Sequence, residues 1–172
     1  MRLFFALWPE LSSRKHWRAE LAMPAQSLGG RAMPMQNLHL TLAFLGEVAG
    51  DRMHQLIRLG DDLPQDAIKL RFDRIECWKN AGLAVLRPTE TPPALTRLVG
   101  QLNTGLRMAG VPLEPGNFKP HVTLARHVST AEPSLPVWPV IEWQVPAIVL
   151  VRSRLSPEGS DYAVLHEWPL QQ

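Results

Sequence analysis

The pentapeptide His39-Leu40-Thr41-Leu42-Ala43 returns later in the chain as His121-Val122-Thr123-Leu124-Ala125. Four of the five positions are identical, and the fifth is aliphatic in both copies. The copies begin 82 residues apart, at 39 and 121, which is close to half of the 172-residue chain. Each copy has the apolar spacing of a β-strand and follows a segment that contains a predicted helix. The repetition therefore indicates a duplicated half-domain.

The sequence around the two copies alternates between strand-like and helix-like spacing. Strands are predicted at 2–8, 38–45, 67–77, 83–86, 121–125, 143–152 and 162–168. Helices are predicted at 10–23, 51–63 and 92–108, with loops or turns at 24–34, 80–82 and 157–159. Strands that meet at hairpins and alternate with about three helices are typical of an α+β protein with mainly antiparallel sheet. No linker divides the chain, so residues 1–172 are expected to form a single domain.

The composition excludes several classes of protein. A hydrophobic fraction of 45% and a charged fraction of 20% are ordinary for a soluble globular protein. The longest apolar stretches, 3–8 and 147–151, are far too short to cross a membrane. The single cysteine, Cys77, cannot form an internal disulfide or a thiolate metal cluster. We therefore expect a cytoplasmic protein without membrane contact, although the net charge of +2 alone does not identify its ligand.

The spacing within each copy determines which side chains share a face. Alternate residues of a strand point to the same side, so His39 and Thr41 project together, roughly 6.5 Å apart along the strand. Leu40 points the other way, into a core. His121 and Thr123 are expected to project together in the same manner. If the two strands meet around a pseudo-twofold axis, two imidazoles and two hydroxyls line one cleft.

These four groups suit the opening of a cyclic phosphodiester. One group must take a proton from the nucleophile, and another must give a proton to the departing oxygen. Histidine has an ordinary pKa of about 6.5, so one imidazole can be neutral while its partner is protonated. The hydroxyls of Thr41 and Thr123 can donate hydrogen bonds to the non-bridging oxygens. No Cys, Asp or Glu cluster lies near either copy, so neither a metal nor a cofactor is expected.

The stretches that contain and surround the copies resemble the two-histidine phosphoesterase superfamily, and within it the bacterial and archaeal RNA 2′,3′-cyclic phosphodiesterases, historically called 2′-5′ RNA ligases. The resembling stretches are 2–7, 37–46, 118–126 and 153–156, followed by Tyr162. The resemblance implies a bilobal, pseudo-twofold fold with two mainly antiparallel sheets flanked by helices and the active-site cleft between the lobes. The motifs, at 39–42 and 121–124, would belong to one lobe each. It also implies that His39 is the proton donor and His121 the proton acceptor.

Further ligand contacts are expected beside the motifs. The family has a phosphate-binding arginine closely after the second motif, and Arg126 occupies that place. Strict alternation gives Arg126 the parity of Val122 rather than that of His121, so a bulge or the end of the strand would have to turn it inward. His127 has the right parity and is the rival. The candidates for contact with a base are the aromatic residues close to the motif strands: Phe5, Phe44 and Phe118.

The resulting hypothesis is hydrolysis of a terminal RNA 2′,3′-cyclic phosphate to a 2′-phosphate, with a weak 2′-5′ ligation by the same chemistry. One alternative is a phosphodiesterase that acts on small cyclic nucleotides or on ADP-ribose cyclic phosphate. Another is an RNA-binding module whose histidines only form hydrogen bonds with phosphate. A monomer without a protein partner is expected in each case.

Overall fold

The computed structural model describes residues 1–27, 30–113, 116–128, 140–156 and 159–172. Its α-helices are α1 (Leu11–Ser27), α2 (Met53–Asp61) and α3 (Pro93–Met108), and its 3-10 turns are η1 (Met35–Asn37), η2 (Gly50–Arg52) and η3 (Lys79–Ala81). Its strands are β1 (Arg2–Leu7), β2 (Arg31–Ala32), β3 (Leu40–Glu47), β4 (Lys69–Trp78), β5 (Leu83–Pro88), β6 (Val122–Arg126), β7 (Ile141–Gln144), β8 (Ala147–Ser156) and β9 (Gly159–Pro169). The predicted α+β class is confirmed. Within the described ranges, no helix has the length and apolar character needed to span a membrane.

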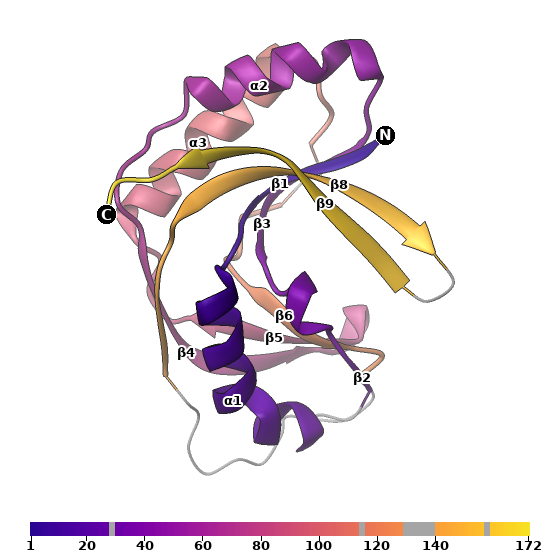
Figure 1. Cartoon of the computed structure of the whole chain (residues 1–172), viewed down its shortest axis with the longest axis vertical. Coiled ribbons are helices and arrows are strands. Elements are labelled where there is room, and N and C mark those ends of the chain that lie inside the picture. The colour runs from indigo at the N-terminus through magenta and orange to yellow at the C-terminus, as the bar shows by residue number, and fades with distance from the viewer. Residues whose placement is uncertain (28–29, 114–115, 129–139, 157–158) are drawn as a thin grey trace.

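The strands form one sheet in which every pairing is antiparallel. The order is β7-β4-β5-β6-β3-β1-β8-β9, and β2 pairs with β6. The expectation of two separate sheets is wrong, because β3 and β6 pair at Leu40 and Val122. They pair at that point alone among the described residues, so the sheet still divides into a His39 half (β3, β1, β8, β9) and a His121 half (β6, β5, β4, β7). The sheet curls between the halves (Figure 1).

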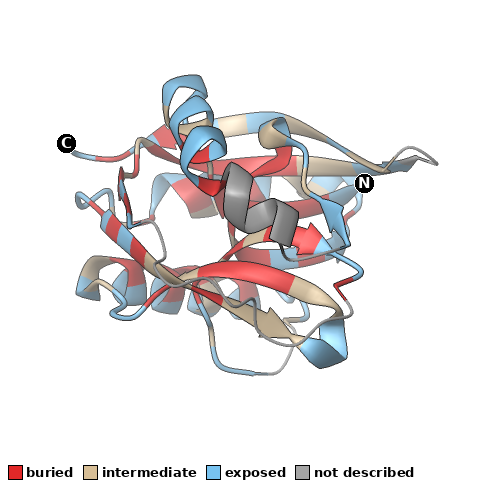
Figure 2. Ribbon diagram, turned by 90° about the horizontal axis from the view of Figure 1, so that it is seen from below, coloured by how far each residue is buried: buried red, intermediate tan, exposed pale blue. Residues whose placement is uncertain are grey.

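The two faces of the sheet carry different apolar clusters. Leu3, Phe5 and Leu7 of β1 are buried in the main core, together with residues from all three helices (Figure 2). Phe4 and Ala6 point to the opposite side, because successive strand residues alternate between faces. There they join a smaller cluster with Val149, Val151, Trp8 and Tyr162. We call this second side of the sheet the cleft face.

The helices cover the main core with the spacing that the sequence predicts. The buried residues of α3 recur every three or four positions, which places them along one side of the helix: Leu95, Leu98, Val99, Leu102 and Leu106. Trp17 of α1 packs edge-on against Phe72 at 5.8 Å and Trp143 at 5.1 Å, in β4 and β7. The helix α2 approaches β9 so closely that a Cβ atom at Gly60 would overlap the indole ring of Trp168.

Some boundaries differ from the predicted ones. Helix α1 continues to Ser27 through Pro24, because proline has a helical φ and removes only one hydrogen bond near a helix end. The predicted strand 143–152 is divided into β7 and β8 on either side of Pro146, which has no N–H to donate. Because β7 pairs with β4 and β8 with β1, the chain crosses between the two halves at this proline. The predicted turn residues Pro157 and Glu158 lie outside the described residues.

Candidate active site

The pairing of Leu40 with Val122 relates the two motif copies by local symmetry. These residues occupy the same position in each copy, and antiparallel strands that pair at equivalent positions are related by a local twofold axis. Both side chains are buried in the main core. His39 and Thr41 flank Leu40 on one strand, and their counterparts flank Val122 on the other. The structure thus brings the four motif side chains together on the cleft face, each histidine on the diagonal from the other.

Each imidazole is oriented by the backbone that leads into its strand. The Nδ1 atom of His39 lies 2.7 Å from the carbonyl oxygen of Asn37, and Nδ1 of His121 lies 2.7 Å from that of Lys119. A carbonyl oxygen can only accept a hydrogen bond, so Nδ1–H donates in both cases. The Nε2 atom of each neutral ring is therefore unprotonated and can accept a proton or a hydrogen bond.

Both motif strands contain a β-bulge at the same position of the repeat. The pairing of β3 with β1 skips Leu42 between Thr41 and Ala43, and the pairing of β6 with β5 skips Leu124 between Thr123 and Ala125. A bulge inserts one residue and shifts the alternation of the residues beyond it. Neither bulge is visible in the sequence.

The bulges turn Phe44 and Arg126, each five residues after a motif histidine, to the cleft face. Phe44 pairs with Phe4, which belongs to the cleft-face cluster. Arg126 pairs with Leu83, which is two residues from the Thr123 partner Val85 and so shares its face. Strict alternation therefore gave the wrong orientation for Arg126. The rival His127 has a left-handed backbone with φ 57° just beyond the end of β6.

Aromatic rings surround His39. The imidazole is stacked on Trp8 with 4.9 Å between ring centroids and 6° between planes. Phe4 lies at 5.1 Å and Tyr162 at 5.3 Å, edge-on. Burial lowers the pKa of His39 to about 4, helped by the charges of His121 and Arg126, although the hydrogen bond to Asn37 acts in the opposite direction. His39 is therefore neutral at neutral pH in the unliganded protein.

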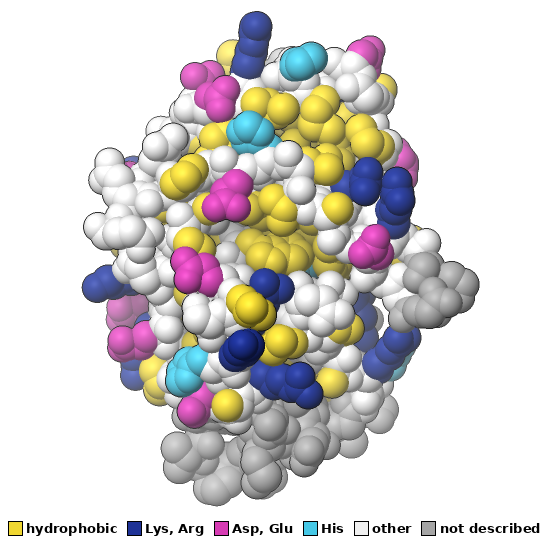
Figure 3. All heavy atoms as spheres, in the orientation of Figure 1, with side chains coloured by type: hydrophobic (Ala, Val, Ile, Leu, Met, Phe, Trp, Pro, Cys, Tyr) yellow, Lys and Arg dark blue, Asp and Glu magenta, His cyan; other side chains and the backbone are white. Residues whose placement is uncertain are grey.

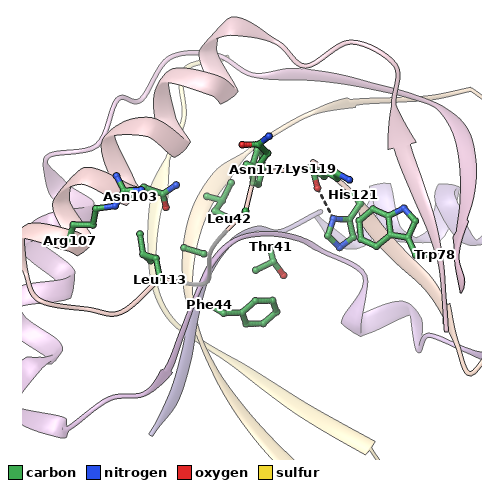
Figure 4. A pocket seen from close by; sticks show the side chains of 13 residues that line it. Thr41, Leu42, Phe44, Trp78, Asn103, Arg107, Leu113, Asn117, Lys119 and His121 are labelled. Carbon is green, nitrogen blue, oxygen red and sulfur yellow. Dashed lines mark hydrogen bonds between the residues drawn. The ribbon is translucent and has the colours of Figure 1, made fainter. Parts of the chain in front are cut away.

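His121 has a different neighbourhood. One aromatic ring, Trp78, lies 4.6 Å from it, on the side away from Thr41 in Figure 4. Nearby, Arg87 forms an ion pair with Glu76 at 2.9 Å, and its Nε donates to the carbonyl oxygen of Pro120 at 3.4 Å. Burial lowers the pKa of His121, and the charge of Arg87 adds to that effect.

Three hollows open along the cleft face. The first, of about 310 Å³, is lined by residues of both motifs, Thr41 and His121, together with Trp78 (Figure 4). The other two have volumes of about 610 and 630 Å³, and both are lined by Arg126 and Tyr162. Figure 3 shows hydrophobic side chains gathered in the middle of the visible face, with Lys and Arg side chains over α1 and at the right-hand margin.

The three aromatic candidates for base contact lie in different environments. Phe44 is 53% exposed and lines the first hollow. Phe118 is half-buried and lines the same hollow. Phe5 is fully buried in the main core, where it stacks on Trp168 at 5.7 Å. The expected base contact by Phe5 is therefore wrong, since its ring cannot reach a ligand.

The sequence reasoning missed several residues that support the motif. Asn37 receives the His39 hydrogen bond on its carbonyl and donates from Nδ2 to the carbonyl oxygen of Ser160 at 2.9 Å, which ties η1 to β9. Its place two residues before His39 matches that of Lys119 before His121, but the two residues differ in type, so the repeat does not reveal it. No pattern in the sequence points to Trp8 or Arg87. In the part of the chain that the structure describes, no three His, Cys, Asp or Glu side chains converge as metal ligands.

Comparison with known proteins agrees with this arrangement. The model of the family described as LigT-like phosphoesterase matches residues 13–84 and 86–160. The RNA 2′,3′-cyclic phosphodiesterase of Escherichia coli strain K12 is 32% identical over 99% of this chain and 97% of its own length, and that of Thermus thermophilus is 30% identical over 99% and 91%. The crystal structure of E. coli LigT complexed with 3′-AMP has a TM-score of 0.86 and 31% identity, covering 99% of this chain and 98% of that one. The chain therefore belongs to the LigT-like phosphoesterase family.

Proposed function

We propose that this enzyme hydrolyses the terminal 2′,3′-cyclic phosphate of RNA to a 2′-phosphate, with water as the nucleophile. The observation that carries the proposal is the matched pair of imidazoles, each held through Nδ1 by the carbonyl two residues before it. The relatives from E. coli and T. thermophilus bear the name RNA 2′,3′-cyclic phosphodiesterase, which supports the same substrate class for this chain.

In the proposed reaction, Nε2 of His121 takes a proton from water as the water oxygen attacks phosphorus. The bond from phosphorus to the ribose 3′-oxygen breaks, and that oxygen receives a proton from Nε2 of His39. Thr41 and Thr123 donate hydrogen bonds to the non-bridging oxygens, and the charge of Arg126 offsets the negative charge that they carry. A 5′-hydroxyl that replaces water in the same step would give a 2′-5′ linkage.

The donor role requires that His39 gains its proton together with the substrate. Its low pKa in the unliganded protein has two electrostatic causes besides burial, the charges of His121 and Arg126. A bound phosphodiester brings a negative charge to the same place, and an opposite charge nearby favours the protonated imidazole. We therefore expect inorganic phosphate to raise the pKa of His39. Titration of the His39 ring protons by NMR, with and without phosphate, measures this change, and an unaltered or lower pKa would contradict the assigned role.

The product identifies the orientation of the substrate. If His39 protonates the 3′-oxygen, an RNA oligonucleotide that ends in a 2′,3′-cyclic phosphate yields a 2′-phosphate and a free 3′-hydroxyl. Phosphorus NMR or chromatography against authentic standards distinguishes the two monophosphates. Mainly 3′-phosphate would reverse the orientation, and no product would contradict the proposed function.

The proposed chemistry does not require a metal, because the two imidazoles provide both proton transfers. Activity is expected to survive exhaustive chelation and to have a bell-shaped pH profile, since one imidazole must be neutral and the other charged. Loss of activity on chelation, followed by recovery with zinc or manganese, would contradict this part of the proposal.

A further inference from the structure

The hollow of about 610 Å³ on the cleft face lies beside His39 but apart from the one in Figure 4. We call it the arginine hollow, because Arg14, Arg31 and Arg126 line it. Trp8 and Tyr162, the two rings that pack on His39, also line it. It shares no described lining residue with the hollow that contains Thr41 and His121. Its volume falls within the usual range of ligand pockets.

The third hollow, of about 630 Å³, has lining residues in common with both. It shares Phe44 and Leu113 with the hollow in Figure 4, and Arg126, Ser160 and Tyr162 with the arginine hollow. We call the three hollows together the groove. A ligand longer than one nucleotide can therefore extend along the groove from the motif histidines into the arginine hollow.

Positive charge is concentrated along this groove. Among the residues that the structure describes, those that line the three hollows include six basic side chains and a single acidic one, Asp161. The basic ones are Arg2, Arg14, Arg31, Arg107, Lys119 and Arg126. The whole chain has 18 basic and 16 acidic residues, so the 12 basic and 15 acidic residues outside this lining carry an acidic excess. A groove lined by one sign of charge attracts a polyanion.

Two of the arginines lie directly opposite one another. The short strand β2 pairs with β6 in the register that places Arg31 across from Arg126. Like charges in that position repel one another, and a bound phosphate group can accept hydrogen bonds from both guanidinium groups. The chain nevertheless holds β2 close to β6 at this point, because Gly30 approaches the Arg126 backbone so tightly that a Cβ atom there would overlap the carbonyl oxygen.

A third arginine adds a donor from a different element. Arg14 of α1 donates from Nη1 to the carbonyl oxygen of Gln36 at 3.4 Å. Its Nε is buried and has no hydrogen-bond partner among the residues that the structure describes. Arginine side chains bind phosphate oxygens through several N–H groups at once. The arginine hollow therefore has the charge and the donors of a phosphate site.

We propose that the arginine hollow binds the phosphodiester group next to the cyclic end of the RNA, with Arg14 and Arg31 as its specific ligands. This inference rests on the proposed function and deepens it, because it makes a polyribonucleotide the preferred substrate. A cyclic mononucleotide has no such phosphodiester and leaves the hollow empty.

The test compares adenosine 2′,3′-cyclic monophosphate with a tetra-adenylate that ends in the same cyclic phosphate. The wild-type protein should have the higher kcat/KM on the tetranucleotide. Arg14→Ala and Arg31→Ala should each lower that value about tenfold and reduce its salt dependence by about one unit of log–log slope. Both variants should leave kcat/KM on the mononucleotide within about twofold of wild type, since a phosphate contact acts only where the phosphate is present.

Arg18→Ala is the matched control, because Arg18 lies on the same helix as Arg14, is exposed and lines none of the three hollows. It should behave as wild type on both substrates. Arg31→Lys should retain part of the preference for the tetranucleotide. Equal losses on both substrates, or no loss on either, would overturn the inference.

Failure of the proposed function would be recognised separately, as no turnover of either substrate by the wild-type protein. The hollow is then tested by the anisotropy of a fluorescein-labelled tetra-adenylate that ends in a 2′-phosphate. Binding weakened about tenfold by Arg14→Ala and Arg31→Ala, but not by Arg18→Ala, supports the phosphate site. Equal binding by all four proteins excludes it.

Discussion

His39 and His121 have the same backbone support but different surroundings. In both halves, Nδ1–H donates to a carbonyl 2.7 Å away and a bulge follows the motif threonine. Three aromatic rings, those of Trp8, Phe4 and Tyr162, enclose His39. His121 lies beside one ring, and the ion pair of Arg87 with Glu76 is close by.

The comparison shows that the backbone sets the orientation of the two imidazoles, whereas the surrounding side chains set their pKa values. The repeated backbone gives two imidazoles with equivalent orientation, which alone would make them interchangeable. The unequal surroundings separate their affinities for a proton, since His39 has its pKa lowered to about 4 and His121 a smaller change in the same direction. In the unliganded protein this order favours His121 over His39 as the protonated ring, so the proposed donor role of His39 requires the bound phosphate to raise the pKa of His39 above that of His121.

The largest expected effect comes from removing either imidazole. His39→Ala and His121→Ala should each lower kcat by about 10²–10⁴-fold, the usual contribution of a general acid or base. Thr41→Val and Thr123→Val should lose less, because they remove one hydrogen bond each. His54→Ala, at an exposed position on α2, is the control and should retain full activity. If folded His39→Ala kept more than about a tenth of wild-type turnover, the role of His39 would be wrong.

The second effect is on stability at acid pH. The pKa of His39 is lower in the folded protein than in the unfolded chain, so the unfolded chain takes up the proton first as the pH falls. The stabilisation is complete above about pH 6.5 and is lost as the pH falls toward about 4, by up to about 3 kcal/mol. Urea unfolding at several pH values should show that the His39→Gln variant does not lose this stability as the pH falls. The His121→Gln variant should abolish a smaller part of the acid-induced loss. Parallel pH dependences for wild type and His39→Gln would contradict the difference between the two halves.

A third change exposes His39 without removing it. Trp8→Ala takes away the stacked ring, so water reaches the imidazole and its pKa should rise toward the ordinary value. Loss of the fixed ring orientation should lower kcat by about tenfold. The pH profile separates this role from general destabilisation, because the limb that belongs to His39 should move while the other remains. Trp8→Phe should restore most of the activity, and a profile identical to wild type in Trp8→Ala would exclude a positioning role.

The smallest expected effect lies in the other half. Arg87→Gln removes a positive charge near His121, so the pKa of His121 should rise while that of His39 stays unchanged. Glu76 keeps a partner in Arg74 at 3.1 Å, which limits the structural damage. The NMR titration of both rings measures the change, and kcat should fall by no more than a few-fold. A shift of equal size at His39 would mean that the charge of Arg87 acts on both rings and not on His121 alone.

The sequence predicted most of what depends on local spacing. Helix α3 and the strands that carry the motifs have clear periodicity, because each has one buried side. The prediction of a base contact by Phe5 failed because β1 is apolar at every position from Leu3 to Leu7, so alternation cannot tell its two faces apart. The orientation of Arg126 stayed open in the sequence, because the bulge at Leu124 that turns it to the cleft face depends on pairing with β5 and leaves no mark in the sequence.

Contacts between residues that are distant in the chain could not be predicted from local spacing either. The single pairing of Leu40 with Val122 joins residues that are distant in the chain, and nothing in either segment specifies its partner. Strand β2 has only two residues and exists because β6 lies beside it. The stacking of Trp8 on His39 likewise depends on the register of β1 with β3. These contacts determine the environment of each histidine, and the motif sequence alone does not specify that environment.

The local twofold axis between the motif strands has a counterpart in the symmetry of the proposed reaction. In an in-line displacement, phosphorus passes through a five-coordinate arrangement in which the entering and leaving oxygens occupy opposite apices. A twofold axis through phosphorus exchanges these apices, whereas neither the cyclic ester nor the opened product has equivalent oxygens at both. Two imidazoles related by such an axis therefore match the midpoint of the reaction better than they match its beginning or its end, and binding that is tightest at the midpoint is what accelerates a reaction.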